Sequence, residues 1–266
     1  MSYSSLLNGI REGNYHAGGI RCLQLFRLQE NYLAELKNEV MRLTQTECAS
    51  DVTNPRHITN WVRPSGEVTQ FSLFNSSGRY DDFSGDHSLS SSGKQFFGAH
   101  AYPILARLLA SLPDLVNFRI NLLGSGAKLS PHEEHSIVRI KSGEVVARVR
   151  FHLPIITAPK AELTLDGHVY HLMPGVIYLI NHGCVHSAQN GSSNMRIHLV
   201  WDMLLSRAAF DVMFGESVLS LPIIRFQEHE RQVTPIRMEH IGSYERIPPA
   251  ITRDEADHLE LWGGTA

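Results

Sequence analysis

The sequence predicts a mainly β fold, a sandwich or barrel of short strands around a polar pocket. Between residues 128 and 201, short β-like stretches and turn signals recur every ~8–12 residues. Residues 145–153 alternate strictly, so Arg148, Arg150 and His152 share one face and apolar side chains take the other. Polar residues on an inner face indicate a pocket lining instead of a solid core.

Length and composition limit the other classes of protein. The chain has 266 residues and a net charge of -3, which suits one large β domain. We find no basic stripe typical of nucleic-acid binding and no apolar run near the ~20 residues of a membrane span. The three cysteines are scattered and odd in number, and the N-terminus lacks a secretion-signal pattern. We therefore expect a cytoplasmic protein with neither nucleic-acid nor membrane partners.

The N-terminal part predicts one strand and one helix. Residues 1–18 are polar and contain glycine, and we expect them to be irregular. Residues 20–26 are predicted to form a strand. Residues 28–43 have apolar positions at helical spacing, which predicts a helix that covers one side of a sheet.

The next elements lead into the β region. Strands are predicted at residues 57–62 and 68–74, joined by a Pro-Ser-Gly turn. Residues 75–94 are rich in Ser, Gly and Asp, and a loop of this length is often a lid or a binding loop. A helix at residues 102–112 and a strand at residues 116–123 follow.

Four further strands complete the predicted β region, at residues 161–165, 168–172, 176–180 and 196–201. Residues 203–214 are predicted to form a helix, and a second short helix is expected at residues 253–262. We expect residues 1–204 to form the β domain with N-terminal helical support. Residues 205–266 would be a helical region appended to the same globule.

Three widely separated positions have the chemistry of a metal site. In an extended segment His132 and Glu134 point to the same face. His186 follows 54 residues later, and Arg196 ten residues after that. Two imidazoles and one carboxylate form the facial triad of non-haem Fe(II) oxygenases, which leaves coordination positions open. An arginine on a neighbouring strand can hold the far carboxylate of an oxo-acid cosubstrate by two hydrogen bonds.

Five short motifs follow one another in the order and strand context of a known family. They are Pro131-His132-Glu133-Glu134, Arg150-Phe151-His152-Leu153-Pro154, Gly175-Val176-Ile177-Tyr178, His186-Ser187-Ala188-Gln189-Asn190 and Arg196-Ile197-His198-Leu199-Val200-Trp201-Asp202. The stretch 121–202 resembles the aspartyl/asparaginyl β-hydroxylase-like group of Fe(II)/2-oxoglutarate-dependent dioxygenases, which includes bacterial proline cis-hydroxylases. With a weaker match at residues 73–78, the resemblance covers about half of the chain.

The resemblance implies a double-stranded β-helix of the jelly-roll, cupin-like type, with flanking N- and C-terminal helices. It implies that Fe(II) is held by His132, Glu134 and His186, with O2 and 2-oxoglutarate as co-reactants. The residues that it implies at the cosubstrate are Arg196 on the distal carboxylate, with Arg150, His152 and Asn121 near it. The triad carboxylate departs from the family pattern, because the usual residue is Asp.

Several nearby residues have competing interpretations. Glu133 and His135 are rivals of Glu134 as the ligand, although an extended segment points them to the opposite face. Asp202 is the only acidic residue near Arg196 in sequence, at an uncertain register. Residues interpreted as structural are His168, His171, His182, Cys184 and His198.

The expected function is oxidation of a small amino acid or amino-acid derivative, by hydroxylation or by a related outcome. A small substrate is favoured because the chain is short and has no peptide-binding repeat domain. Candidate anchors for its carboxylate are Arg63, Arg79 and Arg148. The alternatives are a hydroxylase of peptide or protein side chains and a non-catalytic cupin-like module. The oligomeric state is open, a homodimer included.

Overall fold

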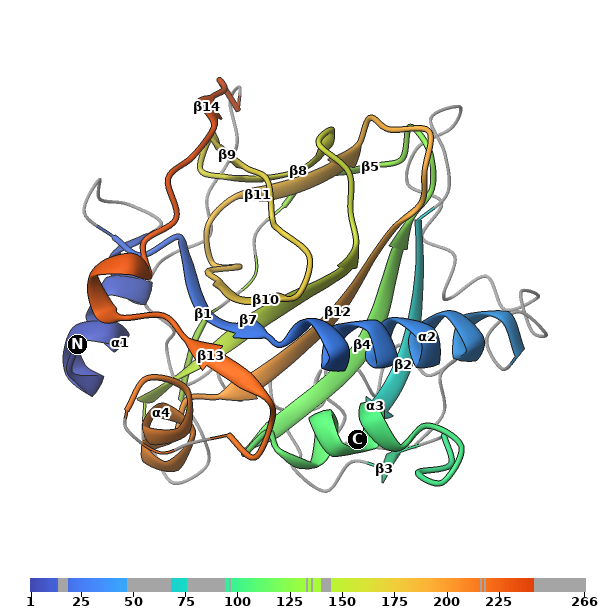
Figure 1. Cartoon of the computed structure of the whole chain (residues 1–266). Helices are drawn as coiled ribbons and strands as arrows, with labels where there is room; N and C mark the ends of the chain where they lie inside the picture. The colour runs from blue at the N-terminus through green and yellow to red at the C-terminus, as the bar shows by residue number, and fades with distance from the viewer. Residues whose placement is uncertain are drawn as a thin grey trace.

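The computed structural model describes residues 1–13, 19–46, 68–75, 94–95, 97–132, 134, 136–139, 145–215, 217 and 219–241. Within these residues the strands form two antiparallel sheets, a major sheet of nine strands and a minor sheet of five (Figure 1). The architecture is the double-stranded β-helix that the sequence resemblance implied.

The major sheet has the order β13-β1-β10-β7-β12-β4-β2-β3, with β6 paired to β7. Its strands are β1 (Cys22–Leu28), β2 (Val68–Asn75), β3 (Lys94–Gln95), β4 (Leu115–Leu123), β6 (Ile137–Arg139), β7 (Val145–Ile156), β10 (Val176–Ile180), β12 (Arg196–Leu204) and β13 (Ile223–Arg225). The minor sheet has the order β14-β9-β8-β11-β5. Its strands are β5 (Lys128–His132), β8 (Ala161–Leu165), β9 (His168–Tyr170), β11 (His186–Asn190) and β14 (Arg237–Met238).

The helices cover the outer face of the major sheet. They are α1 (Tyr3–Gly13), α2 (Glu30–Thr46), α3 (Pro103–Ala110) and α4 (Arg207–Met213), with a short 3-10 turn, η3 (Glu228–Glu230). In Figure 1, α2 runs across the major sheet. No helix in the described ranges is both long and apolar enough to cross a membrane.

Alternation along the central strands divides the interior into an apolar and a polar side. Phe151 on β7 and Phe118 on β4 stack on Trp201 of β12, with ring centroids 5.6 and 5.4 Å apart. These aromatic rings belong to the large core cluster that also contains side chains of the helices. The opposite faces of the same strands carry buried Arg, His, Asn and Asp residues. The prediction that this face is polar is confirmed, and the site lies there.

Three expectations differ from the structure. Residues 3–13 form α1, not an irregular segment, because Leu6 and Ile10 fall on one helical face and are buried. Met203 and Leu204 continue β12, so α4 begins only at Arg207, after Ser206 caps it. The described part of residues 205–241 is not wholly helical, since β13 pairs with β1 and β14 pairs with β9.

The predicted strand at residues 57–62 and the predicted helix at residues 253–262 lie outside the described residues, as does the predicted loop at positions 76–93. The other predicted strands and the helices of residues 28–43 and 102–112 are found with shifts at their ends. Asp166 and Gly167 join β8 to β9 with φ of 48° and 77°. Positive φ at both positions is the requirement of a tight two-residue hairpin turn.

Candidate metal centre and its surroundings

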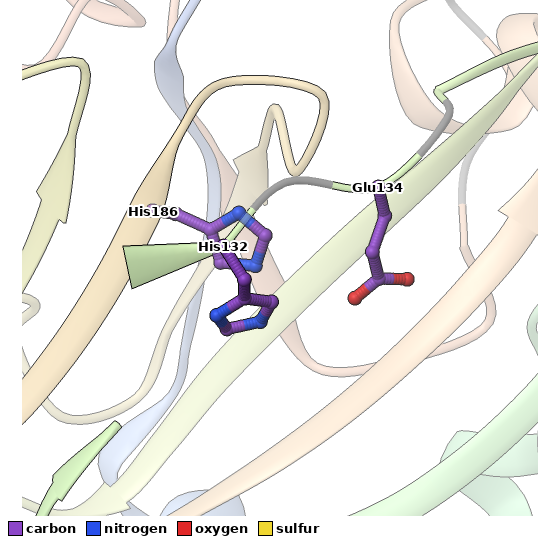
Figure 2. A group of neighbouring side chains, drawn as sticks. All are labelled: His132, Glu134 and His186. Carbon is purple, nitrogen blue, oxygen red and sulfur yellow. The ribbon is translucent and has the colours of Figure 1, made fainter. Parts of the chain in front are cut away.

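Two neighbouring strands of the minor sheet bring the distant histidines together. His132 is the last residue of β5 and His186 is the first of β11, and they are register partners. Their ring centroids are 4.1 Å apart. Glu134 follows β5 by two residues, and its backbone N–H donates to the carbonyl of His182 at 3.1 Å. Figure 2 shows the two rings side by side and the carboxylate of Glu134 beside them.

The donor atoms of these three residues form a set that can hold a metal ion. One ligand atom from each of His132, Glu134 and His186 lies within 4.8 Å of the others. Two imidazole nitrogens and one carboxylate oxygen suit a first-row transition metal such as Fe(II). Within the described part of the chain, this is the only group of three or more such residues that close together.

Backbone carbonyls orient both imidazoles in the same way. Nδ1 of His132 lies 2.8 Å from the carbonyl oxygen of Ser130, and Nδ1 of His186 lies 2.8 Å from that of Cys184. A carbonyl oxygen can only accept, so each Nδ1 carries the proton and each Nε2 keeps its lone pair. Metal-binding histidines usually have their second nitrogen fixed in this manner.

His186 is held in the neutral form that a metal requires. Burial, and then the neighbouring His132, lower its pKa to about 3. Its Nε2 is buried and has no hydrogen-bond partner among the described residues. Buried polar atoms in native proteins nearly always have a partner, so this nitrogen is suited to a metal ion.

Glu134 is anchored to the major sheet by two arginines of β7. Nη1 and Nη2 of Arg150 donate to its two carboxylate oxygens at 2.7 and 3.0 Å, and Nη2 of Arg148 lies 3.7 Å away. Burial opposes ionisation of this carboxyl, but the charges of Arg150 and its neighbours, together with the hydrogen bonds from Arg150, outweigh it and hold the pKa of Glu134 well below its usual value. Glu134 is therefore a carboxylate at neutral pH.

Arg148 and Arg150 have a second carboxylate partner, Asp202 of β12, which is fully buried. Its carboxylate accepts from Nε and Nη2 of Arg150 at 2.7 and 3.0 Å, from Arg148 at 2.6 Å and from Asn117 at 3.1 Å. Despite burial, the charges of Arg150 and Arg148 hold the pKa of Asp202 well below its usual value. The only acidic residue near Arg196 in sequence is thus committed to two other arginines.

Arg196 has polar neighbours but no carboxylate among the described residues. Its Nη1 donates to Oδ1 of Asn121 at 3.1 Å, while Nε and Nη2 lie 3.1 and 2.7 Å from the two ring nitrogens of His198. Burial, followed by the charge of Arg196, holds the pKa of His198 well below its usual value, so its ring is neutral. A neutral imidazole has one acceptor nitrogen, and it can satisfy only one of the two donors that face it.

Burial without a counter-charge is unfavourable for Arg196. The residue is only 3% exposed, and no described carboxylate forms an ion pair with it. Burial lowers its pKa to about 9. A buried charge normally has an ionic partner, so this guanidinium is suited to an anionic ligand.

His152, on β7, lies close enough to Arg196 and to His186 of the triad for both to influence its pKa. Its Nδ1 is 3.4 Å from Nδ1 of His198, at hydrogen-bonding distance. Burial and then the charges of Arg196 and Arg150 hold the pKa of His152 well below its usual value, and His186 adds to this effect. His152 is therefore a neutral imidazole beside His198, the hydrogen-bonding neighbour of Arg196.

His182, interpreted from the sequence only as a structural residue, lies next to the site. It is fully buried, and neither ring nitrogen has a hydrogen-bond partner among the described residues. Burial and then the charge of Arg150 lower its pKa to about 3. Its place beside Glu134 depends on the turn between β10 and β11, which no local pattern encodes.

Some candidates from the sequence cannot be placed. Glu133, His135, Arg63 and Arg79 lie outside the described residues. Arg148, considered as a substrate anchor, has its guanidinium on Asp202. Cys184 is a buried member of the apolar cluster that strands of both sheets form.

Comparison with known families gives one extensive match. The family model described as aspartyl/asparaginyl beta-hydroxylase matches residues 33–205, more than half of the chain. The match includes every candidate site residue named above. No curated protein matches the sequence significantly.

Solved structures give distant similarities. The 2-oxoglutarate-dependent epimerase SnoN of nogalamycin biosynthesis is 11% identical, with a TM-score of 0.45 over 86% of this chain and 98% of SnoN. HygX from Streptomyces hygroscopicus, solved with nickel and 2-oxoglutarate, is 10% identical, with a TM-score of 0.39 over 80% of this chain and 89% of HygX. The DMSP lyase DddQ from Ruegeria pomeroyi is 17% identical, with a TM-score of 0.25 over 33% of this chain and 37% of DddQ.

Proposed function

Since the chain belongs to the aspartyl/asparaginyl β-hydroxylase family of Fe(II)- and 2-oxoglutarate-dependent oxygenases, we propose that it oxidises a small amino acid or amino-acid derivative. The enzyme class and its co-reactants follow from the family. The substrate, and the roles of individual residues, are the content of the proposal.

We assign the iron to His132, Glu134 and His186. The observation that carries this assignment is their convergence across β5 and β11, with donor atoms within 4.8 Å of one another. When bound there, iron supplies the oxidation chemistry, in which 2-oxoglutarate and O2 give succinate and CO2 and one oxygen atom goes to the substrate. The chain contributes two imidazole nitrogens and one ionised carboxylate, which leave coordination positions open on the remaining side.

We assign the distal carboxylate of 2-oxoglutarate to Arg196, supported by Asn121. The support is the buried guanidinium that has polar neighbours but no carboxylate among the described residues. A bound carboxylate would supply the missing counter-charge and accept two parallel hydrogen bonds. We place Arg150 and His152 near the same cosubstrate, since they share the polar face of the major sheet with Arg196, and His152 is a neutral group there.

A compact substrate is favoured because the polar face is enclosed between the two sheets. His186, His152 and Arg196 are 7%, 9% and 3% exposed. Exclusion of water from such a site strengthens the interactions that orient the substrate and limits side reactions. The anchor for a substrate carboxylate stays open, since Arg148 is engaged by Asp202.

A second candidate is hydroxylation of Asp or Asn side chains within a peptide or protein. The observation in its favour is the description of the matching family, which names these two residues. The two candidate functions use the same proposed iron and cosubstrate sites. They differ only in the substrate, which is a small amino acid or derivative in one and a peptide or protein side chain in the other. Free substrates and peptides therefore distinguish them directly.

The test is formation of succinate and CO2 from 2-oxoglutarate with Fe(II) and O2 present. The purified chain is assayed against free amino acids, N-acyl amino acids, and peptides that contain Asp or Asn. Turnover confined to the free or acylated compounds supports the first candidate, and turnover confined to peptides supports the second. Absence of turnover across the panel, with no binding of iron or 2-oxoglutarate, contradicts both.

A matched pair of variants links the activity to the assigned residues. His168 has the same local bonding as His132, with Nδ1 3.1 Å from the carbonyl two residues earlier, but it is not part of the triad. His132→Ala is expected to abolish turnover and His168→Ala to retain it. Equal losses in the two variants would contradict the assignment of the iron site.

A further inference from the structure

Asp202 stands at the centre of a polar row that crosses three strands. It is the register partner of Arg150 on β7 and of Asn117 on β4. The Asn117 side chain bonds it twice: its amide N–H donates to the carboxylate at 3.1 Å, and its Oδ1 accepts from the backbone N–H of Asp202 at 3.2 Å. The position of the carboxylate is therefore fixed by the major sheet itself.

The two edges of the Arg150 guanidinium have different carboxylate partners. Nε and Nη2 bind Asp202, while Nη1 and Nη2 bind the two oxygens of Glu134. Planar bidentate pairs of this kind fix orientation as well as distance. Arg150 thus joins the rigid central strands to a residue that lies just after the end of β5, on the opposite sheet.

The contact falls on the one member of the triad that departs from the family pattern. Glutamate is one methylene longer than aspartate and has one more rotatable bond, so its carboxylate needs more restraint to present an oxygen in one place. A carboxylate has about four lone-pair positions, and it can keep Arg150 on one side while another position faces a metal.

We propose that Asp202 and Arg150 position the Glu134 carboxylate for metal binding, with Asp202 acting through Arg150. The inference rests on the proposed function, because it takes Glu134 to be an iron ligand. Neither Asp202 nor Arg150 is a metal ligand here. Both are positioning residues, and the length of Glu134 is matched to the reach of Arg150.

The experiment measures Co²⁺ affinity by calorimetry and the visible spectrum of the bound Co²⁺ in a double-mutant cycle. The cycle combines Glu134→Asp with Arg150→Lys, which keeps the charge that Asp202 faces. Glu134→Asp is expected to weaken Co²⁺ binding about tenfold in the wild-type background, as loss of an orienting partner commonly does. In the Arg150→Lys background the same change is expected to weaken binding less than about threefold.

Asp202→Asn tests the remote member of the arrangement. It is expected to weaken Co²⁺ binding about tenfold and to alter the Co²⁺ spectrum, although the residue does not touch the metal. The matched control is Arg237→Lys, since Arg237 makes a comparable two-pronged contact with Glu162 near the surface. That variant is expected to keep both affinity and spectrum unchanged. Should Asp202→Asn fail to fold, the cycle decides alone, because Glu134 is 26% exposed at its side chain.

The outcomes separate this inference from the proposed function. Wild-type protein that binds no Co²⁺ contradicts the assignment of the iron site. Wild-type protein that binds Co²⁺, with equal effects of Glu134→Asp in both backgrounds, overturns the positioning role and leaves the iron site intact. Unequal effects, together with an altered spectrum in Asp202→Asn, support the positioning role.

Discussion

At the scale of single residues, Arg196 shows how a site can be unfavourable to the protein without its ligand. Among the described residues its hydrogen-bond partners are an amide and a neutral imidazole, so this buried cation loses hydration and gains little in return. Arg148 and Arg150 are equally buried, yet they share Asp202 and Glu134. This contrast supports the proposed assignment of Arg196 to an anionic ligand.

Replacing Arg196 by glutamine is expected to raise the dissociation constant for 2-oxoglutarate about 100-fold. Removal of one partner of a buried charge pair typically weakens binding by ~3 kcal/mol. Co²⁺ affinity is expected to be unchanged, and the free energy of unfolding without ligand to be equal or higher. Calorimetric titration with 2-oxoglutarate checks the first result, with Arg237→Gln as the surface control. A loss of Co²⁺ binding in Arg196→Gln would show a general disturbance of the pocket.

His182 makes the fold sensitive to acid. Its pKa is about 3 in the folded protein, whereas an unfolded histidine titrates near ~6.5. The unfolded chain therefore binds the extra proton between these values, and stability is complete above pH ~6.5 and is lost as the pH falls towards 3.

At pH 5 this residue is expected to lower the free energy of unfolding by ~2 kcal/mol relative to pH 7.5. Between pH 7.5 and pH 5, the free energy of unfolding of His182→Leu should therefore fall by ~2 kcal/mol less than that of the wild type. Urea unfolding at both pH values measures the difference, and His100→Gln, a change at an exposed position, is the control. The same pH dependence in wild type and His182→Leu would contradict the prediction.

At the scale of elements, the turn before β10 depends on a backbone conformation that favours glycine. Gly175 has φ of 74°, its N–H donates to Pro154 of β7, and its carbonyl accepts from Leu28 of β1. A Cβ atom there would lie 2.6 Å from Cδ2 of Leu33. The turn thus aligns β10 between its two neighbours in the major sheet.

Gly175→Ala is expected to lower the free energy of unfolding by ~1 kcal/mol, chiefly because a side chain is strained at positive φ. Gly98→Ala is the matched control, since its Cβ would meet nothing within 4 Å, and it should change stability by less than ~0.5 kcal/mol. Urea unfolding curves of both variants provide the measurement. Equal stability of Gly175→Ala and wild type would show that the turn relaxes without strain.

The sequence predicted elements where a local period exists. Residues 145–153 alternate and form β7, and the helical spacing of residues 28–43 becomes α2. The helix α1 was missed because polar residues and glycines outweighed the four-residue spacing of Leu6 and Ile10. The strands β13 and β14 were missed because three- and two-residue strands carry no periodic signal, and only their partners define them.

The candidate site was predictable to a similar extent. The spacing of His132 and Glu134 is local, and the structure brings His186 to them across paired strands. The partners of the arginines were not predictable, because they depend on how β7, β12 and β4 are aligned. Nothing in the order of residues states that Asp202 faces Arg150 and Arg148 instead of Arg196.

At the scale of the whole molecule, the segment after α4 joins the two sheets. Phe226 N–H donates to Leu25 at the β1 edge, and further along Ile236 N–H donates to Val169 at the β9 edge. Its strands β13 and β14 are the outermost members of the major and minor sheets. The region expected as an appendage therefore covers one edge of each sheet, and unpaired sheet edges favour association between chains.

This arrangement has a consequence for biosynthesis. During translation, one margin of each layer stays open until residues 223–238 have left the ribosome, although the proposed iron ligands were made long before. A nascent chain that stalls before residues 223–238 emerge would expose two unpaired sheet edges to neighbouring chains. Early folding around the metal would not cover these edges. Ribosome-bound chains that end at residue 221, followed by a linker long enough to fill the exit tunnel, should accordingly recruit chaperones more strongly than chains that end at residue 241 and carry the same linker.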